Sequence, residues 1–167
     1  MAVSAILFLA ACSKDDNPQA TSTLHVRLTD APAALDSVFV DIQQVRVKMS
    51  TDSSNNDGWI TMNTNSGIYN LLELQNGIDT LLGTDTLPTG TVKQLRFVLG
   101  DSNRVVESGI SYPLTIPSGS ESGLKINMNK ILTPGGTDTL LIDFDAALSI
   151  RQEVDGSYKL RPVLQIR

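Results

Sequence analysis

The residue types that most often carry out catalysis or bind transition metals are scarce in this chain of 167 residues. It contains one cysteine, Cys12, and one histidine, His25. A catalytic triad or a zinc site requires more imidazoles or thiolates than these two residues supply. His25 alternates with apolar residues, so we expect it on the exposed face of a strand rather than in a catalytic role. We therefore expect no enzyme activity, no bound metal and no cofactor.

Two carboxylates could support a different chemistry. Asp143 and Asp145 flank the apolar Phe144, so in a strand both would point to the same face. A glycosidase uses two carboxylates at about this separation. A solvated strand face with ion pairs explains the same pattern and is the more economical interpretation. A carboxylate-dependent glycan hydrolase would require a deep cleft in which a third acid or base joins them.

A polar loop and the tryptophan that follows it are candidates for ligand contact. Residues 52–58 are rich in the oxygen ligands that Ca²⁺ prefers, but the glycine is one place late for an EF-hand loop and the distal Glu is missing. The segment is therefore interpreted as a hairpin tip. Trp59, the only tryptophan, is a candidate for stacking on a ligand, with core packing as the alternative.

The N-terminus has the pattern of an export signal. Residues 2–9 are apolar, too few to span a bilayer, and Leu9-Ala10-Ala11-Cys12 follows them. This arrangement resembles the bacterial lipobox, in which small residues precede the cut and the Cys sulfur receives diacylglycerol. The resemblance implies that residues 1–11 are a signal peptide, that Cys12 is lipidated, and that residues 12–22 form a flexible tether.

A short charged motif follows the cysteine. Lys14, Asp15 and Asp16 resemble the surface-export signal of Bacteroidota lipoproteins, and Ser13 in place of Asp resembles lipoproteins sent to the outer membrane. A solvated linker is the alternative interpretation. The resemblance implies an outer-membrane protein held by its lipid, since acyl chains give durable membrane affinity. It also implies that the protein faces the cell exterior.

Charge and composition restrict the partners. The formal net charge is −5, and the sequence offers no basic stripe for neutralising phosphates, so we expect no nucleic acid partner. The expected contacts are the membrane, through the N-terminal lipid, and an extracellular protein or glycan.

The rest of the chain predicts strands. Apolar and polar residues alternate in residues 23–29, where Leu24, Val26 and Leu28 share one face. A similar alternation in residues 38–49 changes phase at Gln43-Gln44, which predicts a β-bulge. Further strands are expected near residues 112–116, 124–128, 140–150 and 158–166, and only residues 71–76 suggest a helical turn. The sequence therefore predicts one all-β domain, residues 23–167, built as an antiparallel sandwich.

The last two strands permit a prediction of register. A loop of Asp155, Gly156 and Ser157 would place Val154 opposite Tyr158 and Leu148 opposite Leu164. Glu153 would then face Lys159 on the solvent side. A two-residue turn would instead set Ile150 opposite Arg161, and we expect the odd loop.

Several short motifs carry a family resemblance. They are Val26-Arg27-Leu28-Thr29-Asp30-Ala31-Pro32, Leu87-Pro88-Thr89-Gly90, Leu95-Arg96-Phe97, Ile116-Pro117-Ser118-Gly119, Asp143-Phe144-Asp145-Ala146 and Tyr158-Lys159-Leu160-Arg161-Pro162-Val163. In this order they resemble the family numbered 4382 among the domains of unknown function, which is common in exported lipoproteins. The resemblance implies a transthyretin-like or immunoglobulin-like Greek-key β-sandwich, and it implies no activity.

Four matches to Asp followed by Ser or Thr and an aliphatic residue resemble the O-glycosylation motif of exported Bacteroidota proteins. Their hydroxyl residues are Ser37, Thr80, Thr86 and Thr139. A polar turn leading into a strand explains the same pattern. We expect Thr86 and Thr139 to be the most accessible and Ser37 to be partly masked by its strand.

These observations lead to one functional hypothesis with two alternatives. We expect a lipid-anchored envelope protein that acts as a non-enzymatic module for binding, adhesion or assembly. The alternatives are a hydrolase that uses Asp143 and Asp145, and a structural spacer that binds no ligand.

Overall fold

The computed structural model describes residues 19–31, 33–50, 58–117 and 123–167. Within these ranges no helix is long and apolar enough to cross a membrane. Strands dominate, with one 3₁₀ turn and one α-helical turn. The elements are β1 (Thr21–Thr29), β2 (Ser37–Met49), β3 (Trp59–Thr61), β4 (Asn63–Thr64), β5 (Gly67–Asn70), η1 (Leu71–Leu74), β6 (Thr80–Pro88), β7 (Thr91–Leu99), β8 (Arg104–Glu107), β9 (Ile110–Thr115), β10 (Leu124–Ile131), β11 (Thr137–Phe144), α1 (Ala146–Ser149), β12 (Ile150–Gln152), β13 (Tyr158–Leu160) and β14 (Leu164–Ile166).

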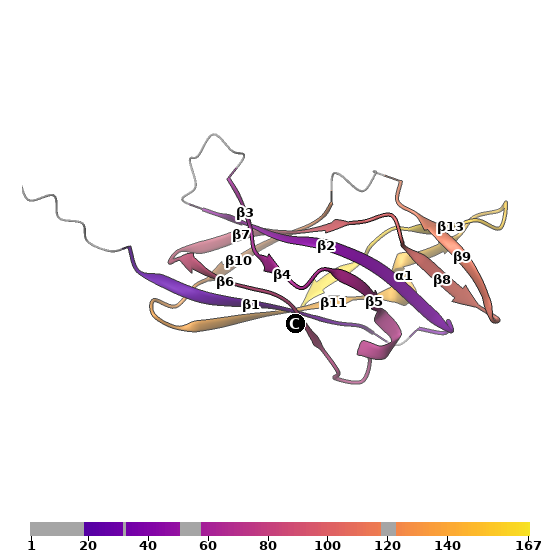
Figure 1. Cartoon of the computed structure of the whole chain (residues 1–167), viewed down its shortest axis with the longest axis horizontal. Coiled ribbons are helices and arrows are strands. Elements are labelled where there is room, and N and C mark those ends of the chain that lie inside the picture. Colours follow the sequence, from indigo (N-terminus) through magenta and orange to yellow (C-terminus); the bar gives the residue numbers. More distant parts are fainter. Residues whose placement is uncertain (1–18, 32, 51–57, 118–122) are drawn as a thin grey trace, which may run out of the picture.

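The strands form two sheets packed as a sandwich (Figure 1). The smaller sheet has the order β14-β11-β1-β6-β4, and the larger has β10-β7-β2-β8-β9-β13-β12, with β3 and β5 also paired to β2. The prediction of an all-β sandwich with only short helical turns is confirmed. Most pairs are antiparallel, but β1 pairs with β11 and β9 with β13 in parallel. A parallel pair needs a long connection between its two strands. Here that connection contains several other strands of the sandwich, because the members of each pair are far apart in the sequence.

The core lies between the two sheets and follows the predicted alternation. Leu24, Val26 and Leu28 of β1 are fully buried. They pack in the same cluster as inward residues of the larger sheet, among them Val45 and Phe97. Burial of such side chains is the main source of stability, about 1.5–3 kcal/mol for each large one.

Strand β2 contains the predicted irregularity. Its register against β7 shifts between Ile42 and Gln44, so the β-bulge expected at Gln43-Gln44 is confirmed. Val45 and Val47 are therefore buried, as Val40 and Ile42 are before the shift. The polar residues that alternate with Val45 and Val47 point to the outer face.

Two of the expected strands are interrupted near the C-terminus. The strand predicted for residues 140–150 ends at Phe144, because Asp145 caps a helical turn by accepting a hydrogen bond from the Leu148 main-chain N–H at 2.9 Å. The strand predicted for residues 158–166 breaks between β13 and β14, where Pro162 has no N–H to donate to a ladder. The chain uses this break to pass from the larger sheet to the smaller one.

The last hairpin has the predicted kind of loop but at a different position. Ile150 pairs with Leu160 and not with Arg161, so the even loop is excluded. The main-chain N–H of Glu153 donates to the Ser157 carbonyl at 2.8 Å, which makes residues 154–156 the three-residue loop.

The predicted partners in this hairpin change accordingly. Val154 is exposed at the tip instead of facing Tyr158, and Leu164 pairs with Phe144 rather than Leu148. Gly156 supplies the left-handed residue, with φ of 83°, that ends such a loop. The expected contact of Glu153 with Lys159 is present as an ion pair at 3.2 Å.

A buried polar junction ties β2 to the turn after β7. Asp41 is only 6% exposed, and its main-chain N–H donates to the Asn103 side-chain oxygen at 2.9 Å. The Asp41 carbonyl accepts from the Gly100 N–H at 2.8 Å, and its carboxylate accepts from the Ser102 N–H at 3.2 Å. A Cβ atom on Gly100 would lie 2.2 Å from the Asp41 carboxylate, so this approach requires glycine.

We predict that Gly100→Ala lowers the free energy of unfolding by about 1–3 kcal/mol, because the added methyl group displaces a buried and hydrogen-bonded carboxylate. Urea unfolding measures the change. Gly67→Ala is the matched control, since a Cβ there meets nothing within 4 Å. Equal stability of the two variants would contradict this account of the junction.

Candidate binding face

Strands β3, β2, β7 and β10 lie side by side in the larger sheet. Their outward side chains form a regular polar array. Register places these residues in two rows that cross the four strands. All of them are half-buried or exposed. We call this array the basic face; its rows are Thr61, Arg46, Arg96, Lys125 and Trp59, Lys48, Gln94, Asn127.

Positive charge dominates this face although the whole chain is acidic. The four strands β3, β7, β10 and the second half of β2 contain no Asp or Glu. None of the four salt bridges among the described residues involves a cation of the basic face. An adjoining hollow of about 450 Å³ adds the exposed Lys93 beside Lys48. The face therefore combines uncompensated cations with amide and hydroxyl groups.

Trp59, the candidate for ligand stacking, lies on this face and is half-buried. The guanidinium carbon of Arg96 lies 4.1 Å from the centroid of its ring, in a cation–π contact. Arg96 thus reaches across β2 to cover one face of the indole. Its Nε is buried and has no hydrogen-bond partner among the described residues. Stacking of a ligand on Trp59 remains a prediction, limited to ring surface that Arg96 leaves free.

Gly123 allows Arg96 to take this position. Its φ is 60°, and a Cβ atom there would lie 2.8 Å from Cγ of Arg96 and 2.7 Å from the Phe97 carbonyl. The stem of Arg96 therefore packs directly on the backbone at the start of β10. This close approach fixes where the guanidinium can reach.

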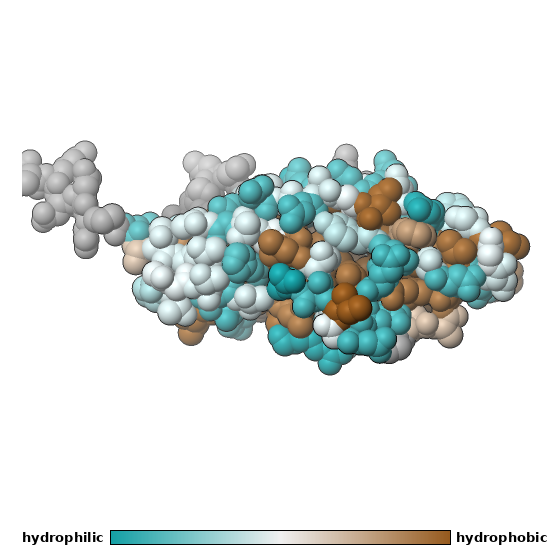
Figure 2. All heavy atoms as spheres, turned by 60° about the horizontal axis from the view of Figure 1, so that its bottom comes forward, coloured by the Kyte–Doolittle hydropathy of each residue, from teal (hydrophilic) through white to brown (hydrophobic). Residues whose placement is uncertain are grey.

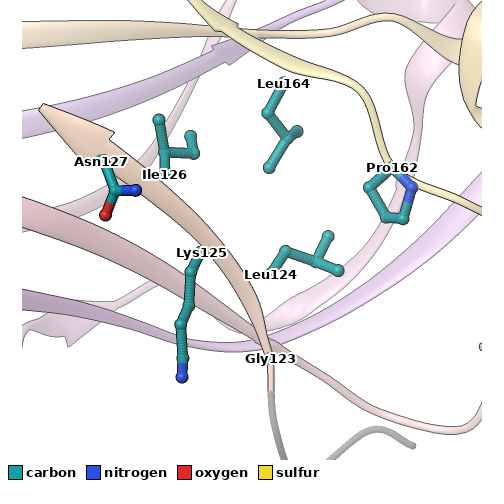
Figure 3. A pocket seen from close by; sticks show the side chains of 7 residues that line it. All are labelled: Gly123, Leu124, Lys125, Ile126, Asn127, Pro162 and Leu164. Atoms are coloured by element: carbon teal, nitrogen blue, oxygen red, sulfur yellow. The ribbon is translucent and has the colours of Figure 1, made fainter. Parts of the chain in front are cut away.

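Strand β10 also borders a hollow beside the basic face. The hollow measures about 420 Å³ and is lined by Leu124, Pro162 and Leu164 together with Lys125 and Asn127 of the basic face. Figure 3 shows that Lys125 points away from Leu164 and Pro162. Lys125 therefore belongs to the basic face by orientation as well as by register.

This cluster was not predicted from the sequence. The acidic net charge favoured no basic stripe, but net charge averages over both sheets. The available signal was the alternation of Arg46 and Lys48 with buried valines, which places both cations on one face. Their neighbours Arg96 and Lys125 come from distant strands, and only the register brings them together.

Asp143 and Asp145, the candidate catalytic carboxylates, both accept hydrogen bonds from other residues of the fold. Asp143 is 2% exposed and accepts a hydrogen bond from the Arg167 Nε at 2.9 Å. Asp145 lies beyond the end of β11 and caps α1, so the two residues do not share one strand face as predicted. The expectation that these acids form ion pairs holds for Asp143.

The negative charges of Asp143 and Asp145 act on a third acid, Asp30. It is 5% exposed and accepts hydrogen bonds from the Ala146 N–H at 2.8 Å and the Gln75 side-chain amide at 3.3 Å. Burial raises the pKa of Asp30 to about 6, and the nearby Asp143 and Asp145 add to this effect. Because both of its oxygens are engaged, Asp30 joins β1, α1 and the segment after η1.

His25 and two of the glycosylation candidates lie on the outer face of the smaller sheet. His25 is half-buried rather than exposed, because it sits in the central strand between Thr84 of β6 and Thr139 of β11. Its Nδ1 has no hydrogen-bond partner among the described residues. Thr139 and Thr86 are exposed on strands.

The other two candidate hydroxyls are less accessible. Ser37, at the start of β2, is half-buried and donates to the Asp36 carbonyl at 2.7 Å. Thr80, at the start of β6, is also half-buried. The order of accessibility of the four hydroxyl residues agrees with the expectation, and their modification remains a prediction.

Figure 2 shows separate apolar groups between hydrophilic ones on the side of the molecule that it presents.

Several predicted sites fall outside the described residues. These are Cys12, Lys14, Asp15, Asp16 and the loop at residues 52–57. In the described ranges, no group of three or more His, Cys, Asp or Glu side chains is arranged to hold a metal ion.

The fold and the basic face define a two-sheet β-sandwich with one cationic outer surface. Residues 21–162 match the family DUF4382, described as a domain of unknown function, and the chain belongs to that family. No curated protein matches the chain.

One solved structure similar to this chain is a Bacteroides fragilis protein described as a candidate cell adhesion protein. The two share 9% sequence identity with a TM-score of 0.33. The match covers 89% of this chain and 45% of that protein, so this chain spans less than half of its length.

We predict that stability depends on the ionisation of Asp30. A folded-state pKa of about 6, above the usual 3.8, means that the folded protein favours the protonated carboxyl. That stabilisation is present at low pH and is lost as pH rises through the folded value. Asp30→Asn keeps an oxygen for the Ala146 N–H but carries no charge.

The stability of wild type relative to Asp30→Asn should therefore fall between about pH 4 and about pH 7, measured from urea midpoints. A difference that is constant with pH, or that grows as pH rises, would show that burial does not raise the pKa of this carboxyl.

Proposed function

We propose that this protein is a lipid-anchored, non-enzymatic binding module of the bacterial cell envelope, and that it contacts its ligand with the basic face. The observation that carries this proposal is the array of cations on neighbouring strands that contain no acidic residue. Uncompensated charge of one sign on an ordered surface attracts a partner of the opposite sign. The partner class is an extracellular polymer or protein surface with negative charge.

The anchor follows from the N-terminal motif. A lipid on Cys12, followed by a tether, would hold the protein on the outer membrane with the domain facing the exterior. The tether would end before Thr21, two residues earlier than expected, because Thr21 and the buried Ser22 already belong to β1 of the smaller sheet. The basic face belongs to the other sheet, so attachment at this end leaves it available to a ligand.

The non-enzymatic character is supported by the engagement of the acidic residues. Asp143 pairs with Arg167, Asp145 caps α1, and Asp30 bonds to Ala146 and Gln75. A hydrolase requires carboxylates that are free to meet substrate. The spacer alternative predicts that the basic face binds nothing, and the experiments below distinguish it.

We also propose that Thr86 and Thr139 can carry O-linked glycans, since both are exposed and face away from the core. Glycans on these residues would extend from the smaller sheet and leave the basic face uncovered. A native mass explained by polypeptide and lipid alone would reject this proposal.

We predict that Cys12→Ala releases the protein from membranes, because the acyl chains supply the membrane affinity. Fractionation of cells measures this release. Replacing Lys14, Asp15 and Asp16 with Ala should keep the protein on the membrane but reduce its cleavage by protease added to intact cells. Retention of the Cys12→Ala protein, or equal cleavage of the second variant, would contradict the corresponding part of the proposal.

Binding through the basic face is tested with two variants of equal net charge. The face variant carries Arg46→Glu and Lys125→Glu. The control variant carries Arg151→Glu in β12 and Arg161→Glu between β13 and β14, both at exposed sites away from the basic face. We expect extracellular material from cultures of the native host, immobilised on a resin, to retain wild type and control but not the face variant. Equal retention of all three proteins would reject the face, and retention of none would favour the spacer.

A further inference from the structure

The first row of the basic face places three like charges side by side. Arg46 pairs in register with Arg96, and Arg96 pairs with Lys125. Like charges directly opposite each other on neighbouring strands are destabilising. Among the described residues no carboxylate bridges any of the three. By contrast, Lys130 of the same strand β10 pairs with Asp138 at 2.9 Å. A bound anion would remove the repulsion that the row contains.

The arrangement of the charges fits an extended anion better than a small one. The three cations of the first row stand on three neighbouring strands, whose backbones lie about 4.8 Å apart, and the Arg96 guanidinium extends across β2 to Trp59. Lys48 and Lys93 continue the positive charge at the adjoining hollow. A small anion would contact only one or two of these groups. A polymer with a negative charge on successive units can contact several at once.

The polar groups beside the cations fit a carbohydrate. Thr61 lies at the end of the first row and offers a hydroxyl group, Gln94 and Asn127 lie together in the second row and offer amide groups, and Trp59 offers part of an aromatic ring. Such groups bind sugar hydroxyls and the apolar faces of sugar rings.

The same composition disfavours two other polyanions. The large exposed apolar side chains of the described chain lie outside the two rows, whereas a membrane-binding face buries apolar side chains in lipid. Trp59 is the one aromatic residue in the two rows, and a single ring cannot stack successive bases as single-stranded nucleic acid requires.

We propose that the ligand of the basic face is a linear acidic polysaccharide, whose charged groups bind across Arg46, Arg96 and Lys125. This proposal rests on the proposed function and specifies its ligand class. A carboxylate or sulfate that meets the Arg96 guanidinium competes with the ring of Trp59 for the same cation. Binding should therefore change the environment of Trp59, and since this is the only tryptophan, its fluorescence reports on the face itself.

The test titrates the full-length Cys12→Ala protein with polygalacturonate and follows both heat and tryptophan fluorescence. We expect saturable binding, a change in emission, and an affinity that falls as NaCl is raised from about 0.05 M to about 0.5 M. The methyl ester of the same polymer has the same backbone without charge and should not bind. The face variant should lose affinity by about tenfold or more, and the control variant should not. If the double Glu variant does not fold, Arg46→Gln with Lys125→Gln replaces it.

The outcomes separate this inference from the proposed function. Vesicles of phosphatidylcholine with and without phosphatidylglycerol provide the second probe. Binding to the anionic vesicles but not to polygalacturonate, with loss in the face variant, would overturn the polysaccharide and leave the face as the binding site. Polygalacturonate binding that is equal in the face and control variants would overturn both. Absence of binding to polygalacturonate, or equal binding of its methyl ester, would overturn this inference.

Discussion

The phase change in β2 is the constraint on which the rest of the structure depends. Before the shift, Val38, Val40 and Ile42 point into the core, and regular alternation would continue the inward series with Gln44, Arg46 and Lys48. Burial of two unpaired cations in the core would cost several kcal/mol for each ion. The bulge between Ile42 and Gln44 instead turns Val45 and Val47 inward. The same extra residue therefore completes the core and places Arg46 and Lys48 on the outer face.

The basic face is consequently built around β2, which pairs with more strands than an edge strand does. β2 pairs with β3, β5, β7 and β8, so its outward side chains stand on a strand with neighbours on both sides. The Asp41 junction holds the turn after β7 against β2, and Gly123 lets the stem of Arg96 lie on the start of β10. Repulsion within the first row is sustained by this framework, because the stability comes from the buried side of the same strands. A ligand that supplies negative charge meets an array that is already in place.

Much of the fold could be predicted because a period of two reports directly on burial. That pattern predicted the inward face of β1, the bulge in β2 and the loop parity of the last hairpin. The helical turn α1 escaped prediction because residues 140–150 continue an apolar pattern, while the Asp145 cap depends on where β11 ends. The break at Pro162 escaped for a related reason, since only the tertiary fold decides that the chain changes sheets there.

The candidate site was predicted only in part. Trp59 was a candidate for ligand stacking, with core packing as the alternative, but its partner Arg96 comes from a strand that follows much later in the chain. Sequence alone places Arg46 and Lys48 on one face, but it does not show that Arg96 and Lys125 extend the same row. The partnership of Asp30 with Ala146 was likewise hidden, because it joins the end of the first strand to a helical turn near the other end of the chain.

The most direct measurement of the central claim is a map of the bound surface by NMR, in which backbone amide shifts are followed as polygalacturonate is added to the isotope-labelled protein. The account predicts that the largest shifts cluster at Arg46, Lys48, Trp59, Arg96 and Lys125, while the Thr86 and Thr139 amides of the smaller sheet stay unchanged. Shifts concentrated on the smaller sheet, or spread evenly over both sheets, would contradict it.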